Sequence, residues 1–487
     1  MKNKTAYLFI AAAVVFFAID TFQKLPYSPD DTFIYMQYAR NISGGEGFSF
    51  NAGESSYGVT SPLWVIILTI PYIFGFDGFW FSKILDLVCA ICSVLIFYRL
   101  AKLLFSKDSS NFFPIFASSL FILNIWFIRW SFTGMETNFA VLCVLLIFYL
   151  YYKKNYSLCF FLLGLFFLVR PEGIFLFLLI LISLFVEKRK SLKQDYKSIL
   201  LYLILFLIPV LPFLIYAKLA FGTFVANTAL GKSTLTLSPG IINVQIIEIV
   251  KTLAPSSGIE IILGIVFGVY LIKKKQFLNY AALILWPVVL ILVYILTDAD
   301  IISRYFMIII PVFTFLAVKS IELLSKRQNL GAVILYSAIL IISQISFYKF
   351  VKPHTDNFSE GVEKCLIPIG KWFNEKTPSD TKILINDVGA IGYYSNRYII
   401  DAAALINSDL NMNQKIMATP LEKRMNPYNL LEFVYADYVV ERDTTLENKT
   451  IIAGNKKLEQ VLYKLFPGLG ISDDKPKYYK VYKISEN

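Results

Sequence analysis

The 487-residue sequence is poor in histidine and in charge, and each shortage excludes a class of protein. It contains a single histidine, His354, so neither a histidine-rich metal centre nor a Ser-His-Asp triad is expected. Charged residues make up 17% and hydrophobic residues 56% of the chain, against about 25% and about 45–50% in ordinary globular proteins. The composition indicates an integral membrane protein, and its chemistry must rest on carboxylates and cations.

Cysteine is also scarce. Of the five cysteines, four lie inside apolar runs, and Cys365 alone belongs to the polar C-terminal region, which therefore has no internal disulfide. Cys89 and Cys92 form a CxxC pair, which has a redox or metal-binding interpretation. Because no second pair and no histidine lie near them in the sequence, we interpret them as packing thiols.

Apolar runs predict eleven membrane spans, since a hydrocarbon core about 30 Å thick needs about 20 apolar residues per helix. They lie near residues 6–22, 80–100, 112–129, 137–152, 156–169, 173–186, 198–218, 258–272, 277–297, 303–318 and 329–350. The first run lacks a small-residue cleavage site before Gln23, so we expect an uncleaved span there.

Lysine and arginine orient these spans. The net charge of +11 comes largely from short basic clusters between apolar runs, as in cytoplasmic loops, and does not indicate nucleic-acid binding. The runs before and after Arg170-Pro171-Glu172-Gly173 could form one interrupted helix, but the positive-inside rule favours a hairpin turning at the outer face. For the same reason, the run Pro62–Phe76 is expected to lie in the outer interface.

The C-terminal region has the composition of a soluble domain from Lys352 onward. A helical pattern over 361–376 and strand patterns at 383–385, 398–401, 438–441 and 478–484 predict a small α/β unit. The predicted fold is thus a polytopic α-helical membrane domain, residues 1–351, followed by an extracytoplasmic α/β domain, residues 352–487. The first outer loop, residues 23–79, is expected to carry the active site.

Ionisable residues gather in the expected outer loops, although such groups are costly near a membrane. The loops hold, in order, Asp30, Asp31, Arg40, Glu46 and Glu54; Arg129 and Glu136; Arg170 and Glu172; Lys232; and Arg304. This convergence of acids and bases predicts a site on one face. The alternative is a set of headgroup anchors and solvated loop charges.

Asp30 and Asp31 form the most informative pair. Adjacent carboxylates repel each other, and burial raises the pKa of such a group, which suits a general base. Two carboxylates also suit a hard metal ion. A helix N-cap is the structural alternative, because a helical pattern follows directly. The glycine-rich stretch Gly44–Gly58 then permits tight turns around a ligand.

The stretch from Asp30 to Trp64 resembles the first outer loop of the GT-C glycosyltransferases, especially the bacterial branch that contains the mycobacterial terminal arabinofuranosyltransferase. The resemblance continues at Thr133–Thr137, Val169–Gly173, Phe221-Gly222, Ala226-Asn227-Thr228, Lys232, Ser303-Arg304-Tyr305 and Asp387–Tyr393. It covers most of the chain in order and is more specific to the superfamily than to the sugar. Met135 and Ala226 depart from the leucine and proline usual there.

The resemblance implies a polyprenyl-phosphate-linked sugar donor, transfer on the extracytoplasmic side of the plasma (inner) membrane, and an acid of the first outer loop as catalytic base. That role falls on Asp31 or Asp30, and Glu136 matches a second-loop acid of related enzymes. The residues expected to bind the donor phosphate or substrate are Arg40, Arg170, Glu172, Asn227, Lys232, Arg304 and Tyr305. The metal requirement remains open: the site could bind Mg²⁺ or Mn²⁺ through Asp30, Asp31 and Glu136, or it could use no metal.

The acceptor that the resemblance implies is a cell-envelope glycan, lipid or protein, and the sequence does not discriminate among these three. Two other functions also remain: a transporter or flippase of lipid-linked sugars, and a catalytically inactive glycan-binding homologue. A transporter is expected to show broken helices in two corresponding halves and charges at the membrane midplane. The sequence shows no such symmetry, and its charges fall at one face.

Overall fold

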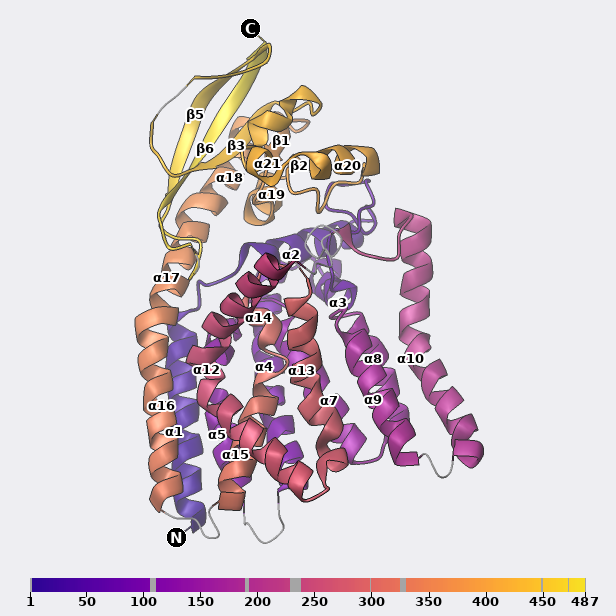
Figure 1. The fold of residues 1–487 in the computed structure, drawn as a ribbon. Helices are drawn as coiled ribbons and strands as arrows, with labels where there is room; N and C mark the ends of the chain where they lie inside the picture. Colours follow the sequence, from indigo (N-terminus) through magenta and orange to yellow (C-terminus); the bar gives the residue numbers. More distant parts are fainter. Residues whose placement is uncertain are drawn as a thin grey trace.

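The computed structural model describes residues 2–105, 111–188, 192–227, 238–297, 299–324, 330–447, 450–471 and 473–486. A bundle of long helices carries a mixed α/β domain at one end, and the N-terminus lies at the opposite end (Figure 1). We call the end that bears the α/β domain the cavity end of the bundle, because the candidate site lies there.

The helices confirm a multi-pass membrane fold. In the described ranges, six helices are long and apolar enough to cross a membrane: Ala6–Gln23, Gly78–Leu104, Tyr196–Phe221, Pro239–Lys273, Phe277–Ile295 and Val333–Lys376. They correspond to α1 (Lys2–Gln23), α4 (Gly78–Leu104), α10 (Leu192–Phe221), α12 (Pro239–Lys273), α13 (Ala281–Ile295) with the 3-10 turn η2 (Phe277–Tyr280) before it, and a helix that starts with α16 (Leu330–Ser346). Shorter apolar helices are α3 (Pro62–Ile73), α5 (Phe112–Ile122), α7 (Thr137–Tyr152), α8 (Tyr156–Phe167) and α9 (Gly173–Lys188). Helix α15 (Ile310–Leu324) also belongs to the bundle and contains Lys319 and Glu322.

Each of the eleven expected spans coincides with helix, but two of them are interrupted. The run 112–129 divides into α5 and α6 (Ile125–Trp130), because the side chain of Asn124 accepts the amide of Trp126 at 3.0 Å and begins a new helix. The run 303–318 divides into α14 (Ser303–Phe306) and α15. Hydropathy does not reveal these breaks, because Asn124 is a single polar residue within an apolar run and residues 307–309 are apolar.

Helices α8 and α9 form a hairpin, as the positive-inside argument predicted. Helix α8 ends at Phe167 and α9 begins at Gly173, whose amide donates to the carbonyl of Arg170 at 2.9 Å in the turn. On its other side α8 packs against α10 at Gly164, where an added Cβ would lie 2.3 Å from the carbonyl oxygen of Phe206. The hairpin therefore places residues 168–172 at a helix end and not inside a span.

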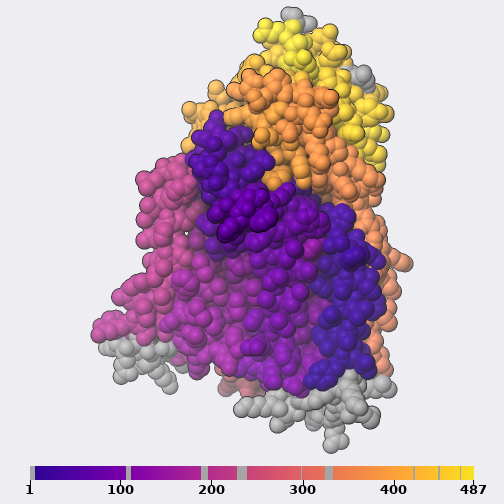
Figure 2. All heavy atoms as spheres, turned by 180° about the vertical axis from the view of Figure 1, so that it is seen from behind, coloured from indigo at the N-terminus to yellow at the C-terminus, as the bar shows by residue number. Residues whose placement is uncertain are grey.

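The segment between α1 and α4 packs against the C-terminal domain. It contains α2 (Asp30–Ser43) and α3, which lie between the bundle and the sheet (Figure 1). Buried residues of this segment, such as Tyr38 and Trp64, belong to one apolar cluster with Phe373 and Ile391 of the C-terminal domain. Seen from behind, the dark violet surface of this segment directly abuts the orange surface of that domain (Figure 2). The domain is thus packed on the bundle as part of a shared core.

The helix that links the two parts does not end at residue 351. Helix α16 continues through the π-helical turn η3 (Phe347–Val351), α17 (Lys352–Gly361), the π-helical turn η4 (Val362–Leu366) and α18 (Ile367–Lys376). The division that composition suggested at 351/352 therefore lies inside a continuous helix. The side chains become more polar there because the surroundings of the helix change, while the helical backbone hydrogen bonding continues.

The C-terminal domain contains a six-stranded sheet of order β2-β1-β3-β6-β5-β4. Its strands are β1 (Lys382–Ile385), β2 (Tyr398–Asp401), β3 (Tyr438–Asp443), β4 (Ile451–Ala453), β5 (Lys456–Phe466) and β6 (Lys477–Glu486), and its helices include α19 (Gly389–Ser395) and α20 (Leu410–Ala418). Strand β1 pairs in parallel with β2 and β3, and the remaining pairs are antiparallel. The four predicted strands are confirmed. Strands β4 and β5 were missed because β5 has only two buried residues, Leu458 and Phe466, and β4 has none.

Candidate active site

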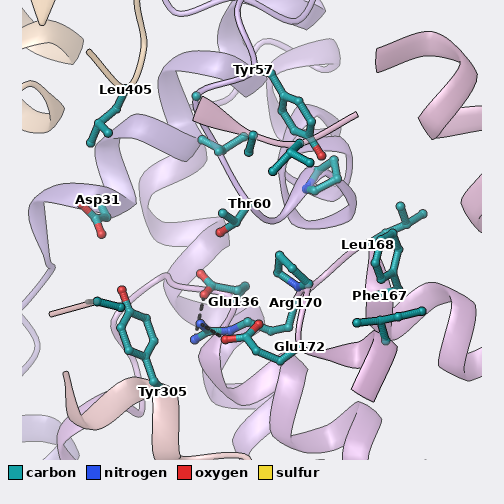
Figure 3. Close-up of a pocket in the computed structure, with 18 of the residues that line it drawn as sticks. Asp31, Tyr57, Thr60, Glu136, Phe167, Leu168, Arg170, Glu172, Tyr305 and Leu405 are labelled. Carbon is teal, nitrogen blue, oxygen red and sulfur yellow. Dashed lines mark ion pairs between the residues drawn. The ribbon is translucent and has the colours of Figure 1, made fainter. Parts of the chain in front are cut away.

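A cavity of about 480 Å³ lies at the cavity end of the bundle, beneath the C-terminal domain. Figure 3 shows charged side chains from distant parts of the sequence pointing into it. Its polar lining includes Asp31, Glu136, Arg170, Glu172, Arg304 and Tyr305, and the rest of its wall is mainly apolar. Six of the residues predicted from sequence therefore meet in one place.

Asp31 and Arg304 form an ion pair in this cavity. Pro29 is the N-cap of α2, so Asp30 and Asp31 are its first two helical residues, where the helix dipole favours negative charge. Arg304 comes from the short helix α14, and its Nη2 atom lies 2.6 Å from Asp31 Oδ2. The Arg304 side chain is 9% exposed and that of Asp31 is 36% exposed. Asp31 is thus the member of the pair that a substrate can reach.

Arg170 lies between two carboxylates. Its Nη2 atom is 3.2 Å from Glu136 Oε1 and its Nη1 atom is 3.9 Å from Glu172 Oε1, the ion pairs drawn in Figure 3. Burial acts to lower the pKa of Arg170, but the charges of Glu136 and then Glu172 raise it above its ordinary value. The guanidinium is therefore permanently charged.

Two tyrosines support the arginines. The ring of Tyr305 lies 5.3 Å from the guanidinium carbon of Arg170 and 5.3 Å from that of Arg304. The ring of Tyr294, on α13, stacks on Tyr305 at 5.5 Å, and its hydroxyl donates to Glu172 Oε1. Such cation–π contacts hold guanidinium groups in place. Tyr294 was not predicted, because a tyrosine inside an apolar run gives no sequence signal.

Several polar atoms of the cavity are buried without a hydrogen-bond partner in the described protein. They include Glu136 Oε2, Arg170 Nε, Glu172 Oε2 and Arg304 Nε. A buried polar atom left unpaired costs about 1–3 kcal/mol, so such a cluster marks a place where a polar ligand would restore hydrogen bonds. The cavity combines these atoms with an apolar wall, which is the usual composition of a small-molecule site.

Asp30 has a different surrounding from its neighbour. Its Oδ2 and Oδ1 atoms accept the backbone amides of Gly389 at 2.8 Å and Ala390 at 2.7 Å, at the start of α19. Burial, together with the charges of Asp387 and Asp31, raises the pKa of the Asp30 carboxyl to about 7, although the two amides act to lower it. Of the two described acids, Asp31 lines the cavity and Asp30 joins α2 to the C-terminal domain.

Arg40 and Glu54 also lie at this domain junction. Arg40 Nη1 donates to the backbone carbonyl of Tyr393 at 3.2 Å, and the guanidinium carbon of Arg40 lies 4.6 Å from the centre of the Tyr393 ring. Glu54 accepts the hydroxyls of Tyr398 at 2.7 Å and Ser408 at 2.6 Å. The structure thus places Arg40, expected from sequence to contact substrate, against the C-terminal domain.

Asn227 lies next to a residue of the cavity wall. The amide of Asn227 donates to the carbonyl of Tyr57 at 2.8 Å, and the neighbouring Ala226 lines the cavity. Lys232 lies outside the described residues. The guanidinium of Arg129 lies between the rings of Tyr27 and Trp130.

The three acids named as possible metal ligands do not form a ligand set. Within the described ranges, no three or more His, Cys, Asp or Glu side chains are placed to hold a metal ion together. Asp30 faces the amides of α19, Asp31 faces Arg304, and Glu136 faces Arg170. The three acids therefore do not converge on one point in the described structure.

The C-terminal domain contributes Leu405 to the cavity wall, which the sequence did not predict. The loop that carries it is shaped by Asp401, whose carboxylate accepts the amides of Ala403 at 2.7 Å and Leu405 at 2.8 Å. A Cβ added to Gly58 would lie 2.9 Å from the carbonyl oxygen of Leu405 and 2.5 Å from the hydroxyl of Tyr38. The two chain segments therefore approach too closely at this rim for a side chain at position 58.

Comparisons with known proteins support the fold. A family model described as "Domain of unknown function (DUF8728)" matches residues 356–482, and no curated protein matches. The crystal structure of ArnT from Cupriavidus metallidurans bound to undecaprenyl phosphate is similar, with 12% identity, 99% of this chain and 98% of that chain covered, and a TM-score of 0.58.

The oligosaccharyltransferase of Archaeoglobus fulgidus is similar in its apo form, with 13% identity, 89% of this chain and 69% of that chain covered, and a TM-score of 0.56. A structure of the oligosaccharyltransferase AglB from the same organism, in complex with an inhibitory peptide and a dolichol-phosphate, is also similar. The identity is 12%, the same shares of both chains are covered, and the TM-score is 0.52. These likenesses confirm the GT-C fold. They do not test the arabinofuranosyltransferase branch, which stays a prediction.

Proposed function

We propose that this chain, which has the GT-C fold, is a membrane glycosyltransferase that transfers a sugar from a polyprenyl-phosphate-linked donor to an acceptor hydroxyl. The observation that carries the proposal is the reachable carboxylate of Asp31 beside the buried guanidinium groups of Arg170 and Arg304 in one cavity. The similar ArnT and AglB structures hold undecaprenyl phosphate and a dolichol-phosphate, which supports a lipid-phosphate donor.

In this proposal Asp31 is the general base. Its carboxylate takes the proton of the acceptor hydroxyl as the hydroxyl oxygen forms a bond to the anomeric carbon of the donor sugar. The bond between that carbon and the phosphate oxygen breaks, and the lipid phosphate leaves with the bonding electrons. A positioned base contributes about 10²–10⁴-fold to such a reaction.

The arginines stabilise the departing phosphate through charge-assisted hydrogen bonds. Because Arg304 already pairs with Asp31, the phosphate must compete with that carboxylate for the guanidinium. Donor binding to Arg304 would then weaken its ion pair with Asp31, which would make that carboxylate a stronger base. This order would keep the base from acting before the donor is in place. Lys232, which lies outside the described residues, is proposed as a third cation for the phosphate.

The apolar wall of the cavity suits the lipid of the donor. Phe167, Leu168 and Phe175 from the α8–α9 hairpin lie on one side, and Val293 of α13 contributes from another helix. A polyprenyl chain lying there would place its phosphate near Arg170, on the turn of the same hairpin. The opposite rim, with Tyr57 and Leu405, is left for the acceptor.

The acceptor class and the sugar stay open in the proposal. A glycan, a lipid or a protein each presents a hydroxyl that Asp31 could deprotonate, and neither a hexose nor a pentose is excluded. We also propose that the cavity faces the extracytoplasmic side of the plasma membrane, since Lys273–Lys275 lie at the end of α12 and in the turn before α13, at the opposite end of the bundle (Figure 1).

Two alternatives make different predictions. A transporter of lipid-linked sugars would hold its substrate near the membrane midplane between symmetric halves, whereas this cavity lies at one end of the bundle. A catalytically inactive homologue would bind a glycan and release no lipid phosphate.

The test is sugar transfer by purified protein in detergent. A panel of polyprenyl-phosphate-linked hexoses and pentoses is incubated with glycan, lipid and peptide acceptors, with Mg²⁺, with Mn²⁺ and with EDTA. We expect release of polyprenyl phosphate from at least one donor, and a loss of about 10²–10⁴-fold in Asp31→Asn. Asp409→Asn, which alters an exposed helix cap of the C-terminal domain, is the matched control and should keep full activity. No release from any donor, or full activity of Asp31→Asn, would refute the proposal.

The orientation has its own test. The native cysteines are free, with Cys89, Cys143, Cys159 and Cys365 buried and Cys92 half-buried in α4, so background labelling should be low. In intact cells, Asp409→Cys should react with a membrane-impermeant maleimide. Labelling that appears only after the cells are opened would place the cavity on the cytoplasmic side.

A further inference from the structure

Helix α4 contains two buried charges that the proposed mechanism does not use. Lys83 and Asp86 lie three residues apart, so both project from one face of the helix, and each side chain is 0% exposed. Burying a charge costs several kcal/mol unless it is paired or hydrogen-bonded. Both residues lie in the first part of α4, near the cavity end of the bundle, and their partners show what they hold.

Asp86 is bonded to the turn before α7. Its Oδ2 atom accepts the amide of Thr133 at 2.7 Å, the hydroxyl of Thr133 at 2.9 Å and the amide of Gly134 at 3.2 Å. Its Oδ1 atom accepts Asn138 Nδ2 at 2.7 Å. Glu136, the ion-pair partner of Arg170, lies between these donors in the sequence. The four hydrogen bonds of Asp86 therefore hold the backbone that carries Glu136.

The turn needs such a fixed acceptor because its backbone is constrained. Gly134 has a φ of +85°, and a Cβ there would lie 2.7 Å from Ser82 Oγ and 2.9 Å from Thr32 Cγ2. The carbonyl of Gly134 accepts Trp64 Nε1 at 3.2 Å. The turn is thus packed between α2, α3 and α4, and Asp86 satisfies the amides that this conformation leaves inside the protein.

Lys83 holds the other catalytic segment. Its Nζ atom donates to the carbonyl of Tyr27 at 2.7 Å and to the hydroxyl of Ser28 at 3.0 Å. Its Nζ atom also lies 5.2 Å from the ring centre of Phe79 and 5.1 Å from that of Phe132. Tyr27 and Ser28 come directly before α2, whose second residue is Asp31. Lys83 therefore fixes the point at which the chain enters the helix of the proposed base.

One hydrogen bond joins the two segments directly: Thr32 Oγ1 donates to the carbonyl of Thr133 at 3.2 Å. We infer that Lys83 and Asp86 are positioning residues, which together fix the distance between Asp31 and the Glu136–Arg170 ion pair. The inference rests on the proposed function. It assigns the buried charges of α4 to the alignment of the site, in addition to their contribution to stability.

Two substitutions test the inference through activity. Asp86→Asn keeps the size of the side chain but turns an amide toward the Asn138 donor, and Lys83→Met leaves the Tyr27 carbonyl without its donor. A displacement of about 1 Å in an active site can cost about 10²-fold in rate, so we expect kcat to fall about that far in each variant. The KM for the lipid donor should stay within about threefold, since the arginines and the apolar wall are untouched.

Lys319→Met is the matched control. Lys319 is a lysine of α15 with 10% exposure that pairs with Glu322 at 2.6 Å and donates to the carbonyl of Leu104, at the far end of α4. Its loss should lower the melting temperature and leave kcat unchanged. Asn138→Ala, which removes one of the four donors to Asp86, is the milder variant and should lower kcat about tenfold, within the range that misplacement causes.

Amide hydrogen exchange gives a readout that does not depend on activity. In Asp86→Asn, peptides covering residues 131–138 should exchange faster, and in Lys83→Met those covering 27–32 should do so, while Lys319→Met should change neither. A wild-type protein that transfers no sugar refutes the proposed function. The exchange experiment then still tests whether Asp86 and Lys83 fix residues 131–138 and 27–32. Folded Asp86→Asn and Lys83→Met proteins with wild-type kcat, or wild-type exchange in both segments, would overturn the inference.

Discussion

Asp31 Oδ2 and Arg304 Nη2 lie 2.6 Å apart, although 273 positions separate the two residues in the chain. The pair connects the first turn of α2 with α14, and both side chains line the cavity. An ion pair with an arginine keeps a carboxylate ionised. An anion that competes for the same arginine can release the carboxylate from the pair. This relationship leads to the first prediction.

Arg304→Gln should lower kcat/KM for the lipid donor by about 10²–10³-fold, because it removes one of the two described guanidinium groups offered to the leaving phosphate. Arg304→Lys keeps the charge without the bidentate geometry, so its loss should be smaller. Both are measured by release of polyprenyl phosphate. Arg397→Gln, whose hydrogen bonds stay within the C-terminal domain, is the control and should remain active. Equal activity of Arg304→Gln and wild type would show that this guanidinium does not contact the phosphate.

Arg170→Gln should lower the free energy of unfolding by about 3–5 kcal/mol, because it leaves the buried charges of Glu136 and Glu172 uncompensated. Adding Glu136→Gln should restore much of that loss, since one unpaired charge is removed with it. Unfolding of the single and double variants in detergent gives the coupling energy. Strictly additive effects would mean that the two side chains do not interact in the folded protein.

The carboxyl of Asp30 should make stability depend on pH. Its pKa is raised from 3.8 to about 7 by burial and then by Asp387, so the folded state holds its proton more tightly than the unfolded state. This contribution to stability is full below pH 3.8 and is lost as the pH rises through about 7. The melting temperature of wild type should therefore fall more steeply over this interval than that of Asp30→Asn. Asp409→Asn should follow wild type, and parallel curves for all three proteins would contradict the assignment.

Gly389→Ala should loosen the contact between α2 and the C-terminal domain. An added Cβ would lie 2.0 Å from the carbonyl oxygen of Asp30, so one of the two backbones must move. We expect a lower melting temperature and faster proteolysis of the C-terminal domain. Gly268→Ala, where a Cβ meets nothing within 4 Å, should not reproduce either effect. A Gly389→Ala protein as stable as the Gly268→Ala control would show that the contact yields without cost.

The helices and most strands could be predicted because their signals are local. Apolar runs of membrane length mark the helices, and the short apolar strands β1 and β2 stand out against a polar background. The break at Asn124 and the exposed strand β5 were missed because neither changes the hydrophobic pattern. The long helix from α16 to α18 was divided at residue 351 because composition reports the surroundings of a segment and not its backbone.

The candidate site was predicted in part. Loop position predicted that Asp31, Glu136, Arg170 and Arg304 share one face, and the four line one cavity in the structure, because residues in loops at the same end of a bundle are confined to one face. Lys83 and Asp86 were not found, since they lie within an apolar run and only their contacts with the turns before α2 and α7 distinguish them. Leu405 was missed because only the position of its loop at the cavity distinguishes it.

The sequence by itself determined that this is a multi-pass helical membrane protein with a polar C-terminal domain and a charged face, because hydrophobicity and charge act residue by residue. The tertiary structure alone decided which of two adjacent acids lines the cavity. In a helix, successive side chains point about 100° apart, so Asp31 meets Arg304 while Asp30 meets the amides of Gly389 and Ala390. Their different surroundings come from chain segments hundreds of residues away, and no local pattern records them.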